Sequence, residues 1–119
     1  MAVIISIDAG TTGVRTFALD ENGVQVGLAY KEFTQHYPFP GWVEHDPTEI
    51  WVAVQDTIRE LAKTLSEPIA CIGIANQRET AVVWNRSSGL PLAPAIVWQD
   101  RRTTKRCSQL EQQGHLGLV

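Results

Sequence analysis

The chain has 119 residues, 44% of them hydrophobic, so it is long enough to bury a core and is expected to form one compact domain. Its formal net charge is -3, from 10 basic and 13 acidic side chains, and its basic residues cluster only between Arg101 and Arg106. A nucleic-acid-binding protein normally carries a concentrated positive face, so this class is disfavoured.

The N-terminal run VIISIDAG, residues 3–10, is rich in β-branched side chains and almost continuously apolar. This pattern predicts an interior strand that is covered on both faces. The segment has no basic leader, and Asp8 interrupts it too early for a signal peptide or a membrane span. We therefore expect a cytoplasmic protein without a membrane span.

Two more strands are predicted before the first helix. The run VRTFALD, residues 14–20, alternates, so that Val14, Thr16 and Ala18 share one face. Asn22 and Gly23 are typical of a hairpin turn, and a third alternating run follows at residues 24–33. Three strands joined by tight turns predict an antiparallel meander.

A proline-rich loop then leads into a predicted helix. Asp46 is a suitable N-cap, Pro47 suits the first helical position, and Glu49 completes a capping-box pattern. Apolar residues recur at helical spacing at Ile50, Val54, Ile58, Leu61 and Leu65. Pro68 ends the pattern, which predicts a helix of about four to five turns.

The apolar run IACIGIA, residues 69–75, predicts another interior strand, parallel to a neighbour because a helix precedes it. It contains Cys71, which we expect to be a buried, reduced thiol. Short strands are expected at 81–84 and 95–98, and a polar helix is expected to end near Gln113, with Gly114 as its stop. Together these elements predict an α/β fold with a mixed sheet.

The loop DAGTTG, residues 8–13, has the composition of a phosphate-binding turn. Gly10 and Gly13 let the backbone approach a ligand and leave N–H groups free, and Thr11 and Thr12 add hydroxyl donors. Asp8 would repel a bare phosphate, so a hydrated Mg²⁺ between the two is the better interpretation. The alternative is a tight hairpin in which the aspartate only bonds the turn.

A second candidate is NQRET, residues 76–80, at the carboxyl end of a predicted strand, where open α/β sheets place their ligands. Arg78 and Glu79 offer donors and acceptors together, as a polyhydroxylated molecule requires. The alternative is a solvated strand end with surface ion pairs.

Tryptophans and arginines give a third, weaker signal. Trp98 ends an apolar strand, and its indole either covers the carbon side of a polyol or packs in the core. Arg101 and Arg102 either bind an anion or pair with surface carboxylates. Trp42 and Trp51 are assigned to packing around the proline loop and the helix.

Four segments, DAGTTGVR, PGWVEHDPTEIW, GIANQRET and AIVWQDRR, resemble in this order the N-terminal part of the glycerol-phosphorylating members of the FGGY carbohydrate kinase family. The resemblance implies a ribonuclease-H-like, actin-like ATPase domain, with the active site in a cleft between two such domains. It weakens after about Cys107.

The resemblance also implies roles for individual residues. Asp8 matches a metal-linked aspartate, and Arg15 matches an arginine near the transferred phosphate. The implied nucleotide-binding residues are Gly10, Thr11, Thr12, Gly13 and Arg15. Arg78 and Glu79 match groups that bind the hydroxyls of glycerol, and Trp98 matches an indole that packs on its carbon backbone. Gly13 and Val14 depart from the family, which commonly has two serines there.

The implied activity is transfer of phosphate from ATP, with Mg²⁺, to glycerol. Two alternatives are a family member that acts on xylulose or ribulose, and a non-catalytic actin-like binding module. Residues 1–119 are expected to be the N-terminal part of the first kinase domain, with the catalytic base and second domain absent. We expect this chain alone to be inactive and its full-length parent to be a homo-oligomer.

Overall fold

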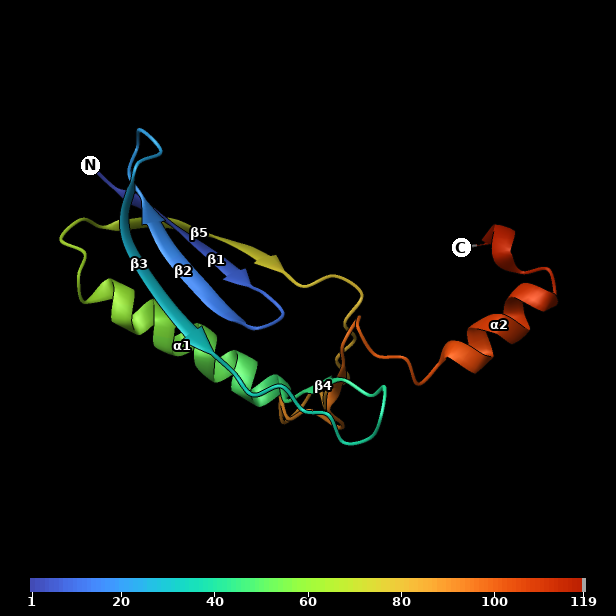
Figure 1. Ribbon diagram of the computed structural model, residues 1–119. Helices are drawn as coiled ribbons and strands as arrows, with labels where there is room; N and C mark the ends of the chain where they lie inside the picture. Colours follow the sequence, from blue (N-terminus) through green and yellow to red (C-terminus); the bar gives the residue numbers. More distant parts are fainter. Residues whose placement is uncertain (119) are drawn as a thin grey trace.

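The computed structural model describes residues 1–118 (Figure 1). Val119, the last residue of the expected domain, lies outside the described residues. In chain order the elements are β1 (Val3–Ala9), β2 (Gly13–Leu19), β3 (Gln25–Glu32), β4 (Glu44–His45), α1 (Pro47–Ala62), β5 (Ile69–Asn76), β6 (Ala95–Ile96), α2 (Thr104–Gln112) and the 3-10 helix η1 (Leu116–Leu118). The main sheet has the order β3-β2-β1-β5, and β4 pairs with β6 in a separate ribbon.

The predicted meander is confirmed, because β1 pairs antiparallel with β2 and β2 with β3. The turn between β2 and β3 contains Gly23 at a φ of 78°, a conformation that favours glycine. The carboxylate of Asp20 accepts hydrogen bonds from the amides of Asn22 and Val24, each at 2.8 Å. Local turn chemistry therefore fixes the register of this hairpin.

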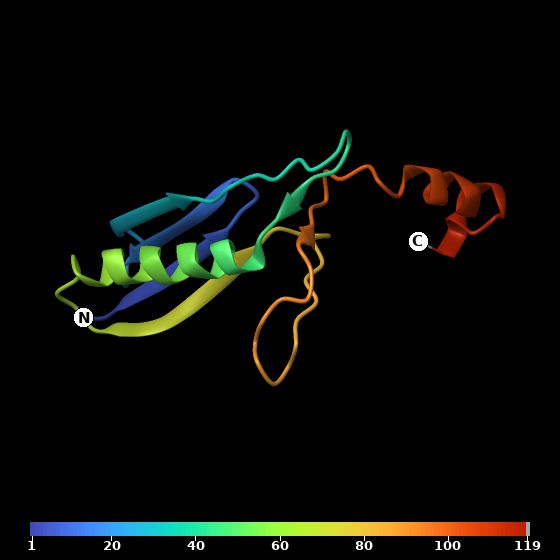
Figure 2. The same cartoon turned by 90° about the horizontal axis from the view of Figure 1, so that it is seen from below.

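Helix α1 lies along one face of the sheet, over β2 and β3 (Figure 2). As the alternation predicted, Val14, Thr16 and Ala18 share a face, and all three are buried beneath the helix. The Thr16 hydroxyl lies 2.8 Å from that of Thr57 on α1, so a polar pair is satisfied within the core. The hydrophobic core is the layer between the sheet and α1.

The predicted start of α1 is confirmed, but its capping box is not. The side chain of Asp46 accepts from the amide of Thr48 at 2.8 Å, and Pro47 begins the 16-residue helix. Glu49 instead accepts from the amide of Thr34 at 2.9 Å, and this bond lowers the pKa of Glu49. The carboxylate of Glu49 therefore bonds the connection between β3 and α1 instead of completing the capping box. Trp51, which we expected to pack, is 60% exposed.

Strand β5 is parallel to β1, as predicted, but it is not an interior strand. Among the described residues it forms an edge of the sheet, and each of its residues is exposed. The cause is the position of α1, which lies over β2 and β3 and leaves β5 uncovered. Cys71 is therefore exposed rather than buried. Strand β1 is central, but only one of its faces is covered. On the other face, Ile4 remains 43% exposed.

The second half of the chain does not complete a compact domain. The chain measures 58 × 30 × 29 Å with a radius of gyration of 18.2 Å, whereas a compact chain of this length has a radius of gyration of about 13 to 14 Å. Helix α2 and η1 extend away from the sheet (Figure 1) and contain no buried residue. The stop at Gly114 is confirmed by its φ of 83°. No helix within residues 1–118 is long and apolar enough to cross a membrane.

The two short strands predicted at 81–84 and 95–98 form only in part. The later segment contributes β6, which pairs with β4. The earlier segment makes isolated bridges, from Ala81 to Ile96 and from Trp84 to Pro91. Its apolar side chains Val83 and Trp84 are exposed, so there is no core to hold a regular strand.

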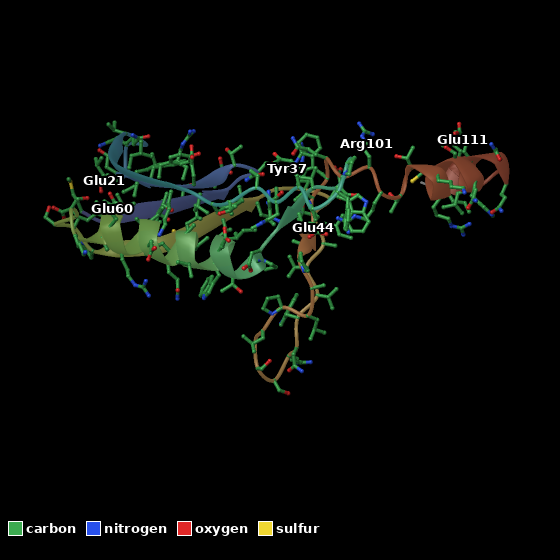
Figure 3. The ribbon with its side chains drawn as sticks, turned by 60° about the horizontal axis from the view of Figure 1, so that its bottom comes forward. Glu21, Tyr37, Glu44, Glu60, Arg101 and Glu111 are labelled. Carbon is green, nitrogen blue, oxygen red and sulfur yellow. The ribbon has the colours of Figure 1, made fainter. Side chains whose placement is uncertain are left out.

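Arg102 ties the proline loop to the segment that follows β6. Its guanidinium donates to Asp100 and Glu44, at 2.8 Å for each closest contact, and its carbon lies 3.7 Å from the centroid of the Trp42 ring. Asp100 also accepts from the amide of Val43 at 2.7 Å. Arg102 thus pairs with carboxylates, and Trp42 packs as expected. Figure 3 shows Glu44 and Arg101 close to this junction, where the chain leaves for α2.

We expect Asp100 to make folding pH-dependent at low pH. The Arg102 guanidinium lowers the pKa of Asp100 to about 2, below the usual value of about 3.9 for an unfolded chain. The stabilisation is therefore fully present above about pH 4 and is lost as the pH falls through 2. Urea unfolding between pH 5 and 2 should show a smaller decrease in the free energy of unfolding for Asp100→Asn than for the wild type. Glu111→Gln, on the projecting helix, should behave as the wild type. If the free energy of unfolding of Asp100→Asn fell with pH as steeply as that of the wild type, Asp100 would not be the cause of the pH dependence.

Candidate functional site

The ends of β1 and β5 meet at one edge of the sheet and border a hollow of about 380 Å³. The residues that line it come from the end of β1 and the loop after it, from the end of β5 and the segment after it, and from the segment after β6: Asp8, Gly10, Thr11, Asn76, Gln77, Arg78, Glu79 and Trp98. Six of these eight residues were predicted as site residues from the sequence. Thr12, Gly13 and Arg15 do not line the hollow.

The loop between β1 and β2 is a closed turn with free amides. The amide of Gly10 donates to the carbonyl of Gly13 at 3.0 Å, which closes the turn. Within residues 1–118, the amides of Thr11 and Thr12 have no hydrogen-bond partner. Two successive free N–H groups in a turn form a concave site for an anion.

The lack of a side chain at Gly13 has a steric reason in this protein. A Cβ at this position would lie 2.6 Å from the carbonyl oxygen of Lys31 and 2.9 Å from the hydroxyl of Tyr30, both on β3. A serine here would force the backbone of β3 to shift. The departure of Gly13 from the family's serine is therefore matched by the close approach of β3.

Asp8 and Arg15 are direct cross-strand partners on β1 and β2, on the face that α1 does not cover. Opposite charges at such a position attract each other. The Arg15 guanidinium also lies 5.7 Å from the centroid of the Tyr30 ring, which supports its position above the sheet. Arg15 therefore stands beside the hollow, next to Asp8, although it does not line it.

Trp98 is joined directly to the loop after β1. Its indole Nε1 donates to the hydroxyl oxygen of Thr11 at 3.0 Å, across 87 residues of sequence. The indole is 53% exposed, so the interpretation of Trp98 as a core residue is wrong. The Thr11 hydroxyl accepts this bond and keeps its own hydrogen for another acceptor.

Arg78 and Glu79 follow β5 at the edge of the hollow. Glu79 has a φ of 59°, the left-handed region that non-glycine residues rarely adopt. The preceding Gln77 is fixed, since its amide donates to the carbonyl of Ala9 at 3.0 Å and its side chain accepts from Thr80 at 3.0 Å. Strained residues held by their surroundings are concentrated at functional sites.

We expect Glu79→Asn to raise the stability of this chain by up to about 1 kcal/mol, because asparagine tolerates the left-handed conformation better than glutamate. Chemical denaturation should show a higher midpoint for this variant. Glu79→Gln is the matched control, since glutamine keeps the size of the side chain without that conformational preference. A midpoint that rises equally in both variants would mean that loss of charge, and not relief of strain, is the cause.

The sequence did not predict the buried polar side chains that lie behind the loop between β1 and β2. His45 is completely buried; its Nε2 lies 2.7 Å from Gln35 Oε1, and its Nδ1 lies 3.1 Å from Gln77 Nε2. Burial lowers the pKa of His45, the nearby His36 lowers it further, and Glu49 opposes the shift. The partners lie 10 and 32 residues from His45, so no local motif signals the arrangement.

Comparison with known proteins identifies the class. Residues 3–117 match the family model of the FGGY family of carbohydrate kinases, N-terminal domain. The chain is 53% identical over 117 residues to the glycerol kinase of Borreliella burgdorferi (strain ZS7), covering 96% of this chain and 23% of that protein. It is 51% identical over 113 residues to the glycerol kinase of Rhizobium rhizogenes, covering 92% of this chain and 23% of that protein.

Solved structures agree. The Plasmodium falciparum glycerol kinase with ADP matches at a TM-score of 0.87 and 38% identity, over 94% of this chain and 23% of that one. A ligand-bound xylulose kinase from Lactobacillus acidophilus matches at 0.91 and 26%, over 97% and 23%. The mixed sheet is that of a sugar-kinase domain with the actin-like ATPase fold. The chain belongs to the FGGY family of carbohydrate kinases, and it spans about a quarter of the length of these relatives.

Proposed function

We propose that the complete protein containing this chain is an ATP-dependent kinase that transfers the γ-phosphoryl group to a terminal hydroxyl of glycerol, giving glycerol 3-phosphate. The observation that carries this proposal is the hollow in which Asp8, Thr11, Arg78 and Trp98 meet from three separate segments. The high identity to glycerol kinases supports glycerol as the acceptor.

On the nucleotide side, the loop Gly10–Gly13 binds the terminal phosphates. The amides of Thr11 and Thr12 and the Thr11 hydroxyl supply neutral donors, and Arg15 supplies a positive charge beside Asp8. Phosphoryl transfer depends mainly on alignment and on neutralisation of charge, which such donors provide.

The residues present fit a magnesium ion bound together with ATP. Asp8 is exposed at the end of β1 and lines the hollow with the loop, so its carboxylate can face a metal held between it and the phosphates. Mg²⁺ commonly takes one or two carboxylates plus phosphate oxygens and keeps several waters. The ion would neutralise phosphate charge, and Asp8 would hold it.

On the acceptor side, Arg78 and Glu79 bind the hydroxyls of glycerol, and the half-exposed indole of Trp98 packs on its carbon atoms. An arginine donates only and a carboxylate accepts only, so the pair matches hydroxyls that do both. The edge of the hollow that these residues share brings the acceptor next to the phosphate loop.

We assign residues 1–119 to the N-terminal part of the first kinase domain of a longer protein. In this proposal the catalytic base and the adenine pocket come from the rest of that protein, so the isolated chain binds ligands weakly and transfers no phosphate. A cytoplasmic location and a homo-oligomeric parent are also parts of the proposal.

The test is alcohol-dependent release of ADP by the complete protein with glycerol, xylulose and ribulose as acceptors. We expect kcat/KM to be highest for glycerol. Higher efficiency with a pentulose would favour the second candidate, which the structural match to a xylulose kinase supports. No turnover with any acceptor would favour a non-catalytic binding module.

A further inference from the structure

A chain of side-chain hydrogen bonds passes behind the phosphate loop through a buried histidine. Gln35 Nε2 donates to the carbonyl of Thr11 at 3.0 Å, and Gln77 Nε2 lies 3.4 Å from the carbonyl of Gly10. His45 joins the two glutamines, at 2.7 Å to Gln35 and 3.1 Å to Gln77. Two successive carbonyls of the loop are therefore held by one connected network.

The partners of the network determine the protonation state of His45. The Gln35 amide nitrogen faces a carbonyl, so its oxygen faces His45 Nε2 and requires a hydrogen there. The Gln77 nitrogen faces a second carbonyl, and its oxygen accepts from Thr80, so this nitrogen donates to His45 Nδ1. His45 is therefore neutral with its hydrogen on Nε2, and burial favours that state.

The network also sets the direction of the loop amides. In a trans peptide the C=O of one residue and the N–H of the next point in opposite directions. Because the carbonyls of Gly10 and Thr11 point to the glutamines, the N–H groups of Thr11 and Thr12 point away from the buried histidine. These are the two amides that have no partner within residues 1–118.

We propose that His45 is a positioning residue for nucleotide binding, which acts through Gln35 and Gln77 to hold the amides of Thr11 and Thr12 toward the terminal phosphates of the nucleotide. This inference rests on the proposed function of the loop. It makes no use of His45 as a metal ligand or a catalytic acid, since the side chain is buried and both ring nitrogens are bonded.

The two glutamines predict different consequences. Apart from its bond to His45, Gln35 bonds only the carbonyls of Thr11 and Phe33, neither of which is on the acceptor side, so its loss should affect nucleotide binding alone. Gln77 directly precedes Arg78 and is bonded to Ala9 and Thr80. Because His45 is bonded to Gln77 as well, the loss of His45 should also disturb the acceptor side. A merely structural role would not separate the two substrates in this way.

The experiment is titration calorimetry of MgADP into the complete protein, with circular dichroism as a check of folding. His45→Phe removes both ring nitrogens, and we expect it to raise the Kd of MgADP by about tenfold, the loss expected for a network of neutral hydrogen bonds. His45→Gln restores one donor and one acceptor and should recover most of the affinity. Gln35→Leu should raise the Kd several-fold and leave the KM of glycerol unchanged.

Thr57→Val is the matched control. It removes another buried polar contact, the one with Thr16, from within the interface between α1 and the sheet, so it should lower the melting temperature without changing the Kd of MgADP. An unchanged Kd in folded His45→Phe, or equal weakening by Thr57→Val, would overturn the inference. If His45→Phe fails to fold, an unchanged Kd in Gln35→Leu would overturn it.

The two proposals fail in different ways in this experiment. Binding of MgADP does not depend on which alcohol accepts the phosphate. A wild-type protein that binds no MgADP would refute the proposed function, whereas wild-type binding that is unaffected by the His45 and Gln35 variants would refute only the positioning role.

Discussion

Replacing Asp8 by asparagine is expected to lower the kcat of the complete kinase by about 10² to 10³-fold, the range found when one preorganised electrostatic group is removed from an active site. Asparagine preserves the size of the side chain but removes the charge that would hold the metal in the proposed site. It also leaves Arg15 opposite a neutral partner on the neighbouring strand. Steady-state ADP release at increasing Mg²⁺ should show a higher magnesium requirement together with the lower kcat.

Asp20→Asn is a suitable control for this prediction. Asp20 is also a carboxylate at the end of a strand, but it closes the hairpin after β2, at the end of the sheet opposite to the phosphate loop. Its loss should affect stability at most. If Asp8→Asn retained wild-type kcat and magnesium dependence, the proposed role of Asp8 would be wrong.

The elements that the sequence predicted well are those that local chemistry decides. The meander follows from two-residue alternation and the turn at Gly23, and the start of α1 follows from Asp46 and Pro47. The exposure of β5 was not predictable in the same way. Its apolar run shows that burial would be favourable, but whether anything covers the strand depends on where α1 packs.

The same distinction applies to the candidate site. The sequence indicated Asp8 and the glycines and threonines of the loop by their composition, and Arg78 with Glu79 by their place after a predicted strand. The structure brings the carboxyl ends of the two strands together at one sheet edge. His45 was missed because its hydrogen-bond partners, Gln35 and Gln77, are distant from it in the sequence and meet it only in the folded chain.

Replacing Arg78 by alanine should reduce kcat/KM for glycerol in the complete kinase by about 100-fold, which corresponds to roughly 3 kcal/mol for a charged donor to the substrate. The KM of ATP should change little, because Arg78 is assigned to the acceptor side, whereas the proposed phosphate donors are in the loop that follows β1. Arg78→Lys should recover only part of the loss, since lysine keeps the charge but not the planar fork of donors.

Arg86→Ala gives the matched comparison. Arg86 is an exposed arginine in the projecting segment between β5 and β6, and it does not line the hollow. Its removal takes away the same charge and should leave kcat/KM unchanged. Because the two variants have equal net charge, a loss of kcat/KM confined to Arg78→Ala would be a local effect at the acceptor side. An unchanged kcat/KM in Arg78→Ala would mean that glycerol is bound by other residues.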